Sequence, residues 1–551
     1  MDRTIEAVFY GRHEADPRAL LYFEWRERLE SGYPVAGFES AVRALAGAET
    51  VDAEGCWALL GEIESVGRDP GWGYEEGESE VALSVQAGRS ESAGGESAVR
   101  RSDARAGGVG FGSAGVGSGG CESTGTGSES GQASVRPPPP GGSTSAAAGS
   151  ADPSSSVSFD NTAVAAPRAL IGVASSDAGP VGLVSSASPG SSASSLASDE
   201  LFDRVYGGWL GRCVGCALGK PLENGFVWTR EHIRTYLERA GAYPLTDYVP
   251  ALLPPSPRFP LNPTWPVSAR GRIDGAPRDD DIDYTVLGLH LLESRGLNFT
   301  ADDVAKLWLE RIPFLQTYTA ERVAYRNLVD GLHPPRTAEV RNPYREWIGA
   351  MIRADIFGYV SPGDPERAAG LAAREAAVSH TGNGVFAAMW AAALVAAAFT
   401  GQDSVRGTSA VTSALVAAQN VLPPRSRLAI ALAEVHADFE RGLSWEEAVD
   451  DIDARHGGYN WVHAIPNACR VAAGLLWGGG DFTRTIASTV QSGADTDSNG
   501  ATAGSVAGIL VGAKGIPGHW IEPVHDMLHS AVMGYDGVRI SELARRTCAL
   551  V

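Results

Sequence analysis

The sequence has little of the chemistry on which several classes of protein depend. Its six cysteines are scattered through 551 residues, which is too sparse for a disulfide framework and fits a reducing compartment. The 45 Lys and Arg residues are outnumbered by 66 Asp and Glu, so the net charge is −21, and no basic run reverses it locally. Because an acidic chain does not attract phosphate backbones, nucleic acid is not expected as a partner.

Long apolar runs are also missing. The longest uncharged apolar run, Val385 to Thr400, is shorter than the ~20 residues needed to cross a bilayer. The first residues carry charges throughout and lack the apolar stretch of a secretory signal. The sequence therefore predicts a cytoplasmic protein without a membrane partner.

The composition divides the chain into three parts. Residues 1–76 are mixed in charge and place apolar residues at helical spacing around Leu20 and Trp57. Residues 77–198 are rich in Ser, Gly and Ala and contain no Trp, Tyr, Lys or His. Such a segment cannot bury enough apolar surface to offset its ordering entropy, so a long disordered linker is predicted. Residues 199–551 are predicted to form a folded domain.

Apolar residues of this domain repeat at helical spacing, for example in the Ala-rich ranges 366–378, 385–399, 411–421 and 427–441. Alternating strand patterns are scarce, so the predicted fold class is all-α. One predicted helix has a glycine at every fourth position, namely Gly500, Gly504, Gly508 and Gly512. Glycines weaken a helix, but because they lack side chains they allow another helix to approach closely along that face. This helix is therefore predicted to be central.

Two Asp-rich runs each come directly before an apolar helix. The first is Asp279-Asp280-Asp281, and the second is Asp495-Thr496-Asp497-Ser498-Asn499. One Asp suffices to cap a helix, whereas adjacent carboxylates repel one another unless they are solvated or bound to a cation. Carboxylate and hydroxyl oxygens suit Mg²⁺, Mn²⁺ or Ca²⁺ rather than zinc. The two runs can converge on one metal site.

Other interpretations of the motifs are less favoured. The second Asp-rich run matches the start of an EF-hand loop, but Val506 stands where that loop needs Glu. An aspartate-nucleophile phosphatase needs a buried strand before the same run, and residues 489–494 make a poor one. The CxxC of Cys213 and Cys216 has no second pair, which favours two packed thiols over a zinc or redox site.

The motifs and their order resemble those of the ADP-ribosylglycohydrolase family over most of residues 201–551. The run from Asp203 to Glu223 is similar to the family's opening helix and the acidic residue after it. The first Asp-rich run matches the family's Thr-Asp-Asp motif, with Asp279 in place of Thr, and the second matches its other metal motif. Ser379-His380 resembles the family's Thr-His, and residues 349–353 resemble the loop that holds the ligand's phosphates.

This resemblance implies a compact orthogonal helical bundle with two bound Mg²⁺ ions, Mn²⁺ being possible. The implied metal ligands are Asp279, Asp280, Asp281, Asp495, Asp497 and Ser498. The implied catalytic base is one of three carboxylates, Glu223, Asp280 or Asp281. The residues assigned to substrate binding are Gly349, Ala350, Met351, His380, Asn383 and His463. A structural role remains open for His463, as does an ordinary turn for Asn383 and the glycine after it.

The implied activity is hydrolysis of an N- or O-glycosidic bond to ADP-ribose, which releases it from a modified protein side chain. Two alternatives stay open: a hydrolase of a small ribosyl compound, and an inactive ligand-binding or structural protein. Residues 1–76 are predicted to pack helices on the catalytic domain, and the rival interpretation is a free-standing recruitment module.

Overall fold

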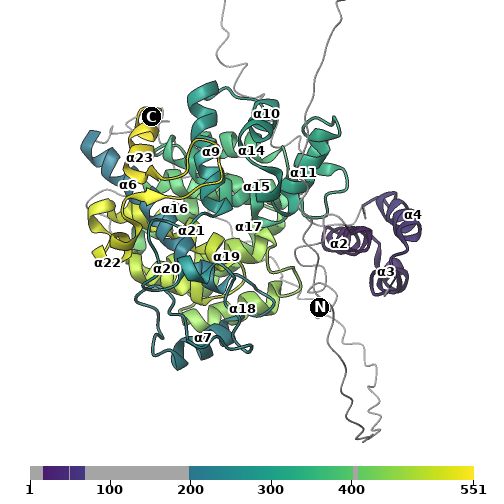
Figure 1. Cartoon of the computed structure of the whole chain (residues 1–551), viewed down its shortest axis with the longest axis horizontal. Coiled ribbons are helices and arrows are strands. Elements are labelled where there is room, and N and C mark those ends of the chain that lie inside the picture. The colour runs from purple at the N-terminus through teal and green to yellow at the C-terminus, as the bar shows by residue number, and fades with distance from the viewer. Residues whose placement is uncertain (1–15, 49, 69–197, 401–406) are drawn as a thin grey trace, which may run out of the picture. The chain divides into compact units, whose positions relative to one another are not determined.

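The computed structural model describes residues 16–48, 50–68, 198–400 and 407–551 (Figure 1). The predicted linker lies outside the described residues, apart from Ser198. The described N-terminal helices belong to the same compact unit as the helices from residue 198 onwards.

Helices make up almost all of the regular structure. The first are α2 (Pro17–Glu30), η1 (Ala36–Phe38), α3 (Glu39–Ala46) and α4 (Ala53–Glu64). From residue 198 follow α6 (Ser198–Gly219), η2 (Lys220–Leu222), α7 (Arg230–Arg239), α8 (Trp265–Ser268), α9 (Asp280–Arg295), α10 (Ala301–Arg311), η3 (Phe314–Gln316), α11 (Thr319–Val329), α12 (Arg336–Glu339), η4 (Ile348–Arg353), α13 (Asp355–Tyr359) and α14 (Pro365–Ala376).

The C-terminal half continues the pattern with α15 (Gly382–Ala398), α16 (Thr408–Gln419), α17 (Arg427–Glu440), α18 (Trp445–His456), α19 (Ala464–Gly478), α20 (Phe482–Gln491), α21 (Thr496–Val511), η5 (Ala513–Gly515), α22 (Gly518–Ile521), η6 (Glu522–Val524) and α23 (Ile540–Cys548). Two short strands, β1 (Met527–Leu528) and β2 (Val538–Arg539), pair antiparallel. The all-α prediction is confirmed. Among the described residues, no helix is long and apolar enough to cross a membrane.

Local sequence determines where several of these helices begin. Thr300 and Asp303 form a capping box at the start of α10, because each side chain accepts from the other's backbone N–H. At the start of α14, the Asp364 side chain accepts from the Arg367 backbone N–H, and Pro365 takes the first helical position. These ends are therefore encoded within a few residues of each helix.

The helix α21 packs against α6 with backbone on backbone. A Cβ added to Gly211 would lie 2.0 Å from the carbonyl oxygen of Gly504, and one added to Gly508 would lie 2.0 Å from that of Gly207. The predicted close approach along the glycine face is thus confirmed. The face ends sooner than predicted, because α21 stops at Val511 and Gly512 is its C-cap with a φ of 72°.

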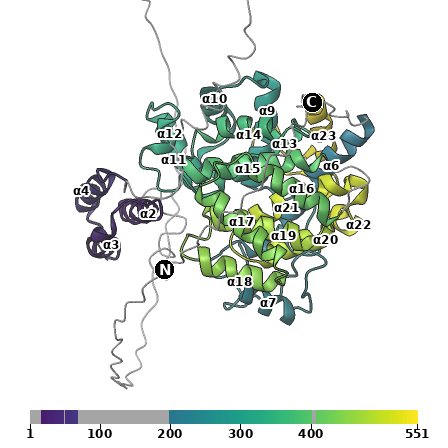
Figure 2. The ribbon, with the colours of Figure 1, turned by 180° about the vertical axis from the view of Figure 1, so that it is seen from behind.

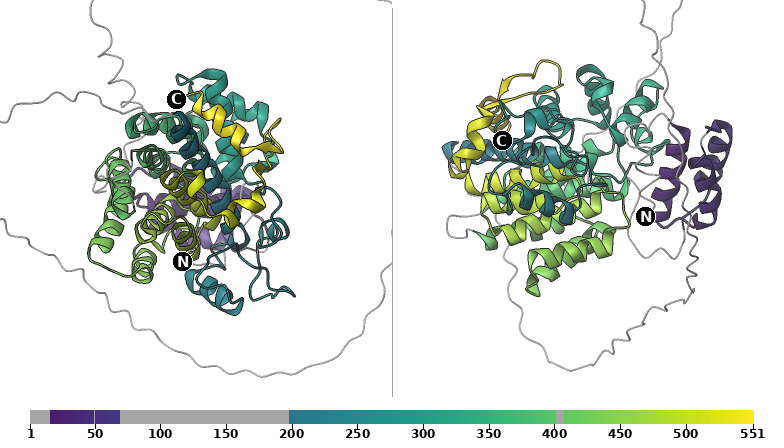
Figure 3. Two further views of the ribbon diagram at one scale, coloured as in Figure 1. Left: turned by 90° about the vertical axis from the view of Figure 1, so that its left-hand side faces the viewer. Right: turned by 60° about the horizontal axis from the view of Figure 1, so that its bottom comes forward.

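The Ala-rich helix α15 is buried from Asn383 to Ala398. Figures 1 and 2 show α9, α10 and α14 on one side of the helical body, and α7 and α18 on the other. The last helix, α23, packs against α6 and α9 (Figure 3), and the Trp209 indole of α6 donates to the Thr547 hydroxyl at 3.1 Å. The elements that carry the predicted site motifs, α6, α9 and α21, contact one another.

The helices α2 to α4 contact the rest of this unit through apolar and charged side chains. Phe23 packs its ring edge-on against Trp347, with ring centres 5.6 Å apart. Arg345 Nη1 lies 2.9 Å from Glu24 Oε2, and Arg427 donates to the Glu30 carbonyl at 3.0 Å. These contacts link α2 to residues of the later helices within the same compact unit.

Candidate active site

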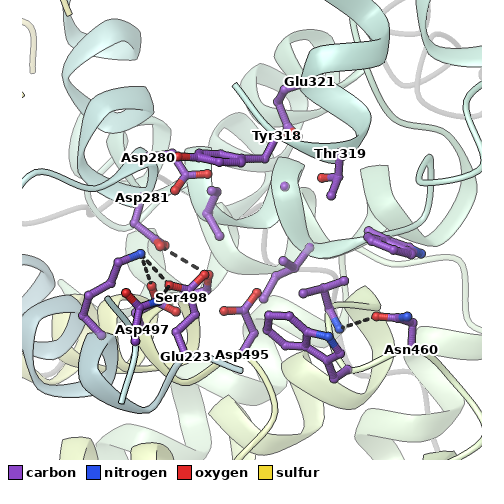
Figure 4. A pocket seen from close by; sticks show the side chains of 18 of the residues that line it. Glu223, Asp280, Asp281, Tyr318, Thr319, Glu321, Asn460, Asp495, Asp497 and Ser498 are labelled. Atoms are coloured by element: carbon purple, nitrogen blue, oxygen red, sulfur yellow. Dashed lines mark hydrogen bonds and ion pairs between the residues drawn. The ribbon is translucent and has the colours of Figure 1, made fainter. Parts of the chain in front are cut away.

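The structure brings the two Asp-rich runs to the wall of one cavity (Figure 4), which has a volume of about 420 Å³. The carboxylates in its lining belong to Glu223, Asp280, Asp281, Glu321, Asp495 and Asp497, and the Ser498 hydroxyl also lines it. Aromatic side chains elsewhere in the lining are Phe23, Phe226, Tyr318, Trp347 and Trp461. A cavity of this size with convergent polar groups is typical of a small-molecule site.

The residues of the first Asp-rich run have two different roles: one caps a helix and two line the cavity. Asp279 is the N-cap of α9, and its Oδ1 accepts from the Asp281 backbone N–H at 3.1 Å. Asp280 and Asp281 follow in the first turn and line the cavity. Arg212 of α6 is fully buried, donates to the Asp281 carbonyl at 2.8 Å and pairs with Asp355 at 2.7 Å. This arginine therefore fixes the start of α9 relative to α6.

The second run begins at a tight turn. Gly493 and Ala494 both have a left-handed backbone, with φ of 84° and 62°. Asp495 then takes the N-cap position of α21, but its side chain makes no capping hydrogen bond. Its backbone N–H donates instead to Asn467 Oδ1 at 3.1 Å. The carboxylate is therefore not used for capping and lines the cavity.

Lys220 lies among the carboxylates of both runs. Its Nζ is 2.5 Å from Asp279 Oδ2, 2.6 Å from Glu223 Oε2 and 2.9 Å from Asp497 Oδ2. Burial opposes the charge on Lys220, but the surrounding carboxylates raise its pKa well above the ordinary value. The side chain is therefore a resident cation of the site.

The single positive charge of Lys220 does not balance the negative charges of the surrounding carboxylates. Burial raises the pKa values of Asp280, Asp281 and Asp495 well above their ordinary range, and neighbouring carboxylates add to the effect. Burial also raises the pKa of Glu223, reinforced by the charge of Asp497. Asp279 is the exception: burial raises its pKa, but Lys220 lowers it to about 2.

The oxygens of the cluster fit a bound divalent cation. Among the described residues, Asp281 Oδ1 and Asp497 Oδ1 are buried and have no hydrogen-bond partner. Ser498 Oγ donates to the other oxygen of Asp281 at 3.2 Å. Buried carboxylate oxygens without donors are costly, and a hard cation would satisfy them.

Cys216 borders the same cluster. Its sulfur and carboxylate oxygens of Asp279 and Asp281 lie within 4.8 Å of one another. Cys213 and Cys216 are both free and buried, as expected for packed thiols. Burial raises the pKa of Cys216 well above its ordinary value, which keeps the thiol protonated and makes it a poor metal ligand.

The loop predicted to hold phosphates forms the 3-10 helix η4. Gly349 lines the cavity, and a Cβ there would lie 2.1 Å from Glu321 Oε1. Arg353 at the end of η4 is buried and forms ion pairs with Glu321 and Glu375. The arginine therefore supports the wall from behind and fixes the Glu321 carboxylate beside Gly349.

Several predicted site residues lie behind the cavity wall. Residues outside its lining are Asp279, Ala350, Met351, His380, Asn383 and His463. His380 Nδ1 contacts Ser379 Oγ at 2.8 Å, and Asn383 accepts from the Leu428 N–H at 3.1 Å. His463 Nδ1 accepts from the Ile465 N–H at 3.2 Å, as the N-cap of α19. The partners of these three side chains, Ser379, Leu428 and Ile465, are likewise outside the cavity lining.

Other residues of the site carry no signal that a motif search would find. Thr319 lines the cavity with a φ of 40°, a strained conformation for a β-branched residue. Phe23 reaches the lining from α2, far away in the sequence. Arg212 and Asn467 act through backbone groups of the Asp-rich runs. Their partners are distant in the sequence, so spacing could not reveal them.

The structure is that of an almost entirely helical protein. Its acidic cavity lies where the N-terminal ends of α9 and α21 meet. The chain belongs to the ADP-ribosylglycohydrolase family, whose model matches residues 197–551. The family suggests glycohydrolase activity on ADP-ribosyl-type substrates.

Comparison with individual proteins adds little to this assignment. A solved structure described as an ADP-ribosylglycohydrolase-related protein complex is 21% identical. The match covers 64% of this chain and 98% of that chain, with a TM-score of 0.39. No curated protein matches the chain.

Proposed function

We propose that this protein is a divalent-cation-dependent glycohydrolase that releases ADP-ribose from a modified protein side chain. The observation that supports it is the pair of buried oxygens, Asp281 Oδ1 and Asp497 Oδ1, which lack hydrogen-bond partners among the described residues. Both residues line the cavity, beside Asp280, Asp495 and Ser498. Mg²⁺ and Mn²⁺ prefer such oxygens.

The residues that would hold the cation are Asp280, Asp281, Asp495, Asp497 and Ser498. When bound, a divalent cation supplies positive charge for ribose hydroxyls and for a water molecule. The chain's own contribution is to hold these oxygens in fixed positions, through Arg212 on one helix start and Asn467 on the other.

Glu223 is our candidate for the proton transfer. Its carboxylate lines the cavity, and Asn262 Nδ2 donates to its Oε2 at 2.9 Å. Burial raises its pKa well above the ordinary value, which favours a carboxyl group that holds a proton for transfer. Two carboxyl groups near a scissile glycosidic bond are the usual requirement for its hydrolysis, and Asp280 is the second candidate.

A small ribosyl compound is the second candidate substrate. The cavity of about 420 Å³ is large enough to enclose one, with Phe226 and Trp461 in its lining to stack on a base. The N-terminal helix α2 contributes Phe23 to the same lining.

The test is release of ADP-ribose from arginine-, serine- and nucleobase-linked substrates in Mg²⁺, in Mn²⁺ and in EDTA. We expect cation-dependent release and a loss of at least about 100-fold in Asp497→Asn, because a ligand should matter more than its supporting shell. Asp274→Asn, an exposed Asp (87%), is the matched control and should keep full activity.

The outcomes separate the candidates. Turnover only on a free ribosyl compound would replace the protein substrate with the small one. No turnover on any substrate, from protein that still binds the cation, would favour the inactive ligand-binding alternative. Release that is equal in EDTA would contradict the cation-dependent mechanism.

A further inference from the structure

The Lys220 ammonium takes up the oxygens on one side of the acidic cluster. It contacts three carboxylates from three elements: Asp279 before α9, Glu223 after η2 and Asp497 in the first turn of α21. An ammonium has three protons to donate, and three carboxylates meet it here. Its side chain is only 12% exposed, so water contributes little.

A lysine suits this position better than an arginine. The ammonium is a compact point charge, whereas the guanidinium is a larger planar fork whose five N–H donors point in fixed directions. The chain uses lysine sparingly, since only Lys220, Lys306 and Lys514 occur among 551 residues. The other two lie on exposed surfaces, with side chains 63% and 84% exposed. The buried position of Lys220 therefore sets it apart from the other two.

The two oxygens of Asp497 divide the cluster into two halves. Its Oδ2 faces Lys220 at 2.9 Å, whereas its Oδ1 is buried without a hydrogen-bond partner in the described part of the chain. Asp281 Oδ1 is also buried without a hydrogen-bond partner in that part of the chain, and it forms a longer ion pair with Arg212 at 3.5 Å. One half therefore already has a cation within hydrogen-bonding distance, whereas the ion pair in the other half is the longer one between Arg212 and Asp281.

Asp279 lies on the side of the cluster that Lys220 occupies. Where the resemblance expects a neutral Thr, the chain has Asp279, whose Oδ2 lies 2.5 Å from the Lys220 ammonium nitrogen. A divalent cation on the Asp279 side would sit within contact distance of the ammonium, where two positive charges repel strongly. The positive charge of Lys220 and the negative charge of Asp279 offset each other.

We propose that the Lys220 ammonium occupies the place of one of the two divalent cations implied by the resemblance, so that this protein binds a single divalent cation. The remaining ligands are Asp281, Asp495, Ser498 and Oδ1 of Asp497, with Asp280 beside them. This inference rests on the proposed function, because it concerns the same cation site.

The test is the number of Mn²⁺ ions per chain, measured on the full-length protein by equilibrium dialysis and by electron paramagnetic resonance. The wild type should bind one ion and give the six-line signal of an isolated Mn²⁺. Lys220→Ala/Asp279→Thr should bind two ions and give the broadened signal of a spin-coupled pair. Lys220→Ala alone should also bind a second ion, and Lys514→Ala should match the wild type.

Each result decides something different. Two ions in the wild type, or a spin-coupled signal from it, would overturn the inference and leave the proposed function intact. A single ion in both Lys220 variants would overturn it too, because the vacated half would then have no affinity for a cation. No bound ion in any variant would defeat the proposed function itself. The wild-type stoichiometry decides the question even if a variant fails to fold.

Discussion

Aspartates that are adjacent in the sequence have different environments in the first Asp-rich run. Asp279 caps α9 and pairs with Lys220, whereas Asp280 and Asp281 line the cavity with raised pKa values. Asp283 lies one turn further on, accepts from Ser530 Oγ at 2.6 Å and pairs with Arg278 at 2.7 Å. The role of each carboxylate is therefore set by the cation or donor that faces it.

Arg212 is the residue on which this arrangement most depends. Replacement by Met removes the cation that pairs with the buried Asp355 carboxylate, and it leaves the Asp281 carbonyl with the Thr285 hydroxyl as its remaining side-chain donor. We expect Arg212→Met to lower the free energy of unfolding by about 3–5 kcal/mol, the usual loss when one partner of a buried ion pair is removed. Urea unfolding followed by circular dichroism measures it, and Mn²⁺ affinity should fall in the same variant.

Two further variants test the cause. Arg212→Met/Asp355→Leu should recover much of the loss, because the Asp355 carboxylate is then no longer buried without its cation. Arg234→Met, on the half-exposed surface of α7, should change stability by less than about 1 kcal/mol. A cost for Arg212→Met as small as that of Arg234→Met would contradict the role assigned to Arg212.

At the scale of elements, the contact between α6 and α21 places the site. Lys220 and Glu223 follow the end of α6, and the second Asp-rich run starts α21. Thr496 at the start of α21 donates to the Gly219 carbonyl at 2.9 Å, so these two ends are held together. The glycines that allow the helices to touch therefore also bring the carboxylates to Lys220.

A methyl group in this contact should separate the helices. In Gly504→Ala, the new Cβ would lie 2.1 Å from the Gly211 carbonyl oxygen, and backbone cannot rotate away as a side chain can. We expect the free energy of unfolding to fall by about 3 kcal/mol, at the upper end of overpacking costs. This outweighs the gain in helix propensity of ~1 kcal/mol. Thermal unfolding provides the measurement.

Gly370→Ala is the matched control for this substitution. Gly370 lies inside α14, and nothing is within 4 Å of the position that its Cβ would take. The variant should therefore gain about 0.5–1 kcal/mol from the lower entropy of its unfolded chain. If Gly504→Ala were stabilised equally, the close packing of α6 and α21 would not be a constraint.

At the scale of the compact unit, the N-terminal helices meet the rest of the protein through buried charges. Glu27 of α2 has one carboxylate oxygen without a hydrogen-bond partner among the described residues, and Arg345 is 3.9 Å from the other. Burial raises the pKa of Glu27 to about 8, and the nearby Glu346 adds to the effect. Glu24, one turn earlier, is instead paired with Arg28 and Arg345.

This environment predicts a pH dependence of stability. Between pH ~4.5 and ~8, Glu27 holds a proton in the folded protein and has lost it in the unfolded chain. The folded state thus binds more protons, so stability should fall as pH rises through this window. We expect the melting temperature to drop between pH 5.5 and pH 8.5, and Glu27→Gln should reduce that drop.

The control is Glu62→Gln, which changes an exposed residue of α4. It should show the same pH dependence as the wild type. If Glu27→Gln and the wild type lost stability in parallel over this window, the buried carboxyl group of Glu27 would not be its source.

Much of the fold could be predicted from the sequence because helices are encoded locally. The Ala-rich ranges predicted around Val385 and Arg427 correspond to α15 and α17. The two Asp-rich runs were recognisable because several carboxylates precede one helix. By contrast, the supporting residues Arg212 and Asn467 act on backbone groups far away in the sequence. No local pattern distinguishes them from ordinary core residues.

The sequence by itself determined the helical class, the glycine face of α21, the two carboxylate motifs and the family. These depend on residue type and short spacing, which a linear pattern preserves. Only the tertiary structure decided that Lys220 lies between Asp279 and Asp497, that Phe23 reaches the cavity, and that His463 lies behind its wall. The physical reason is that charge pairing and burial depend on distances in space, which the packing of helices distant in sequence creates.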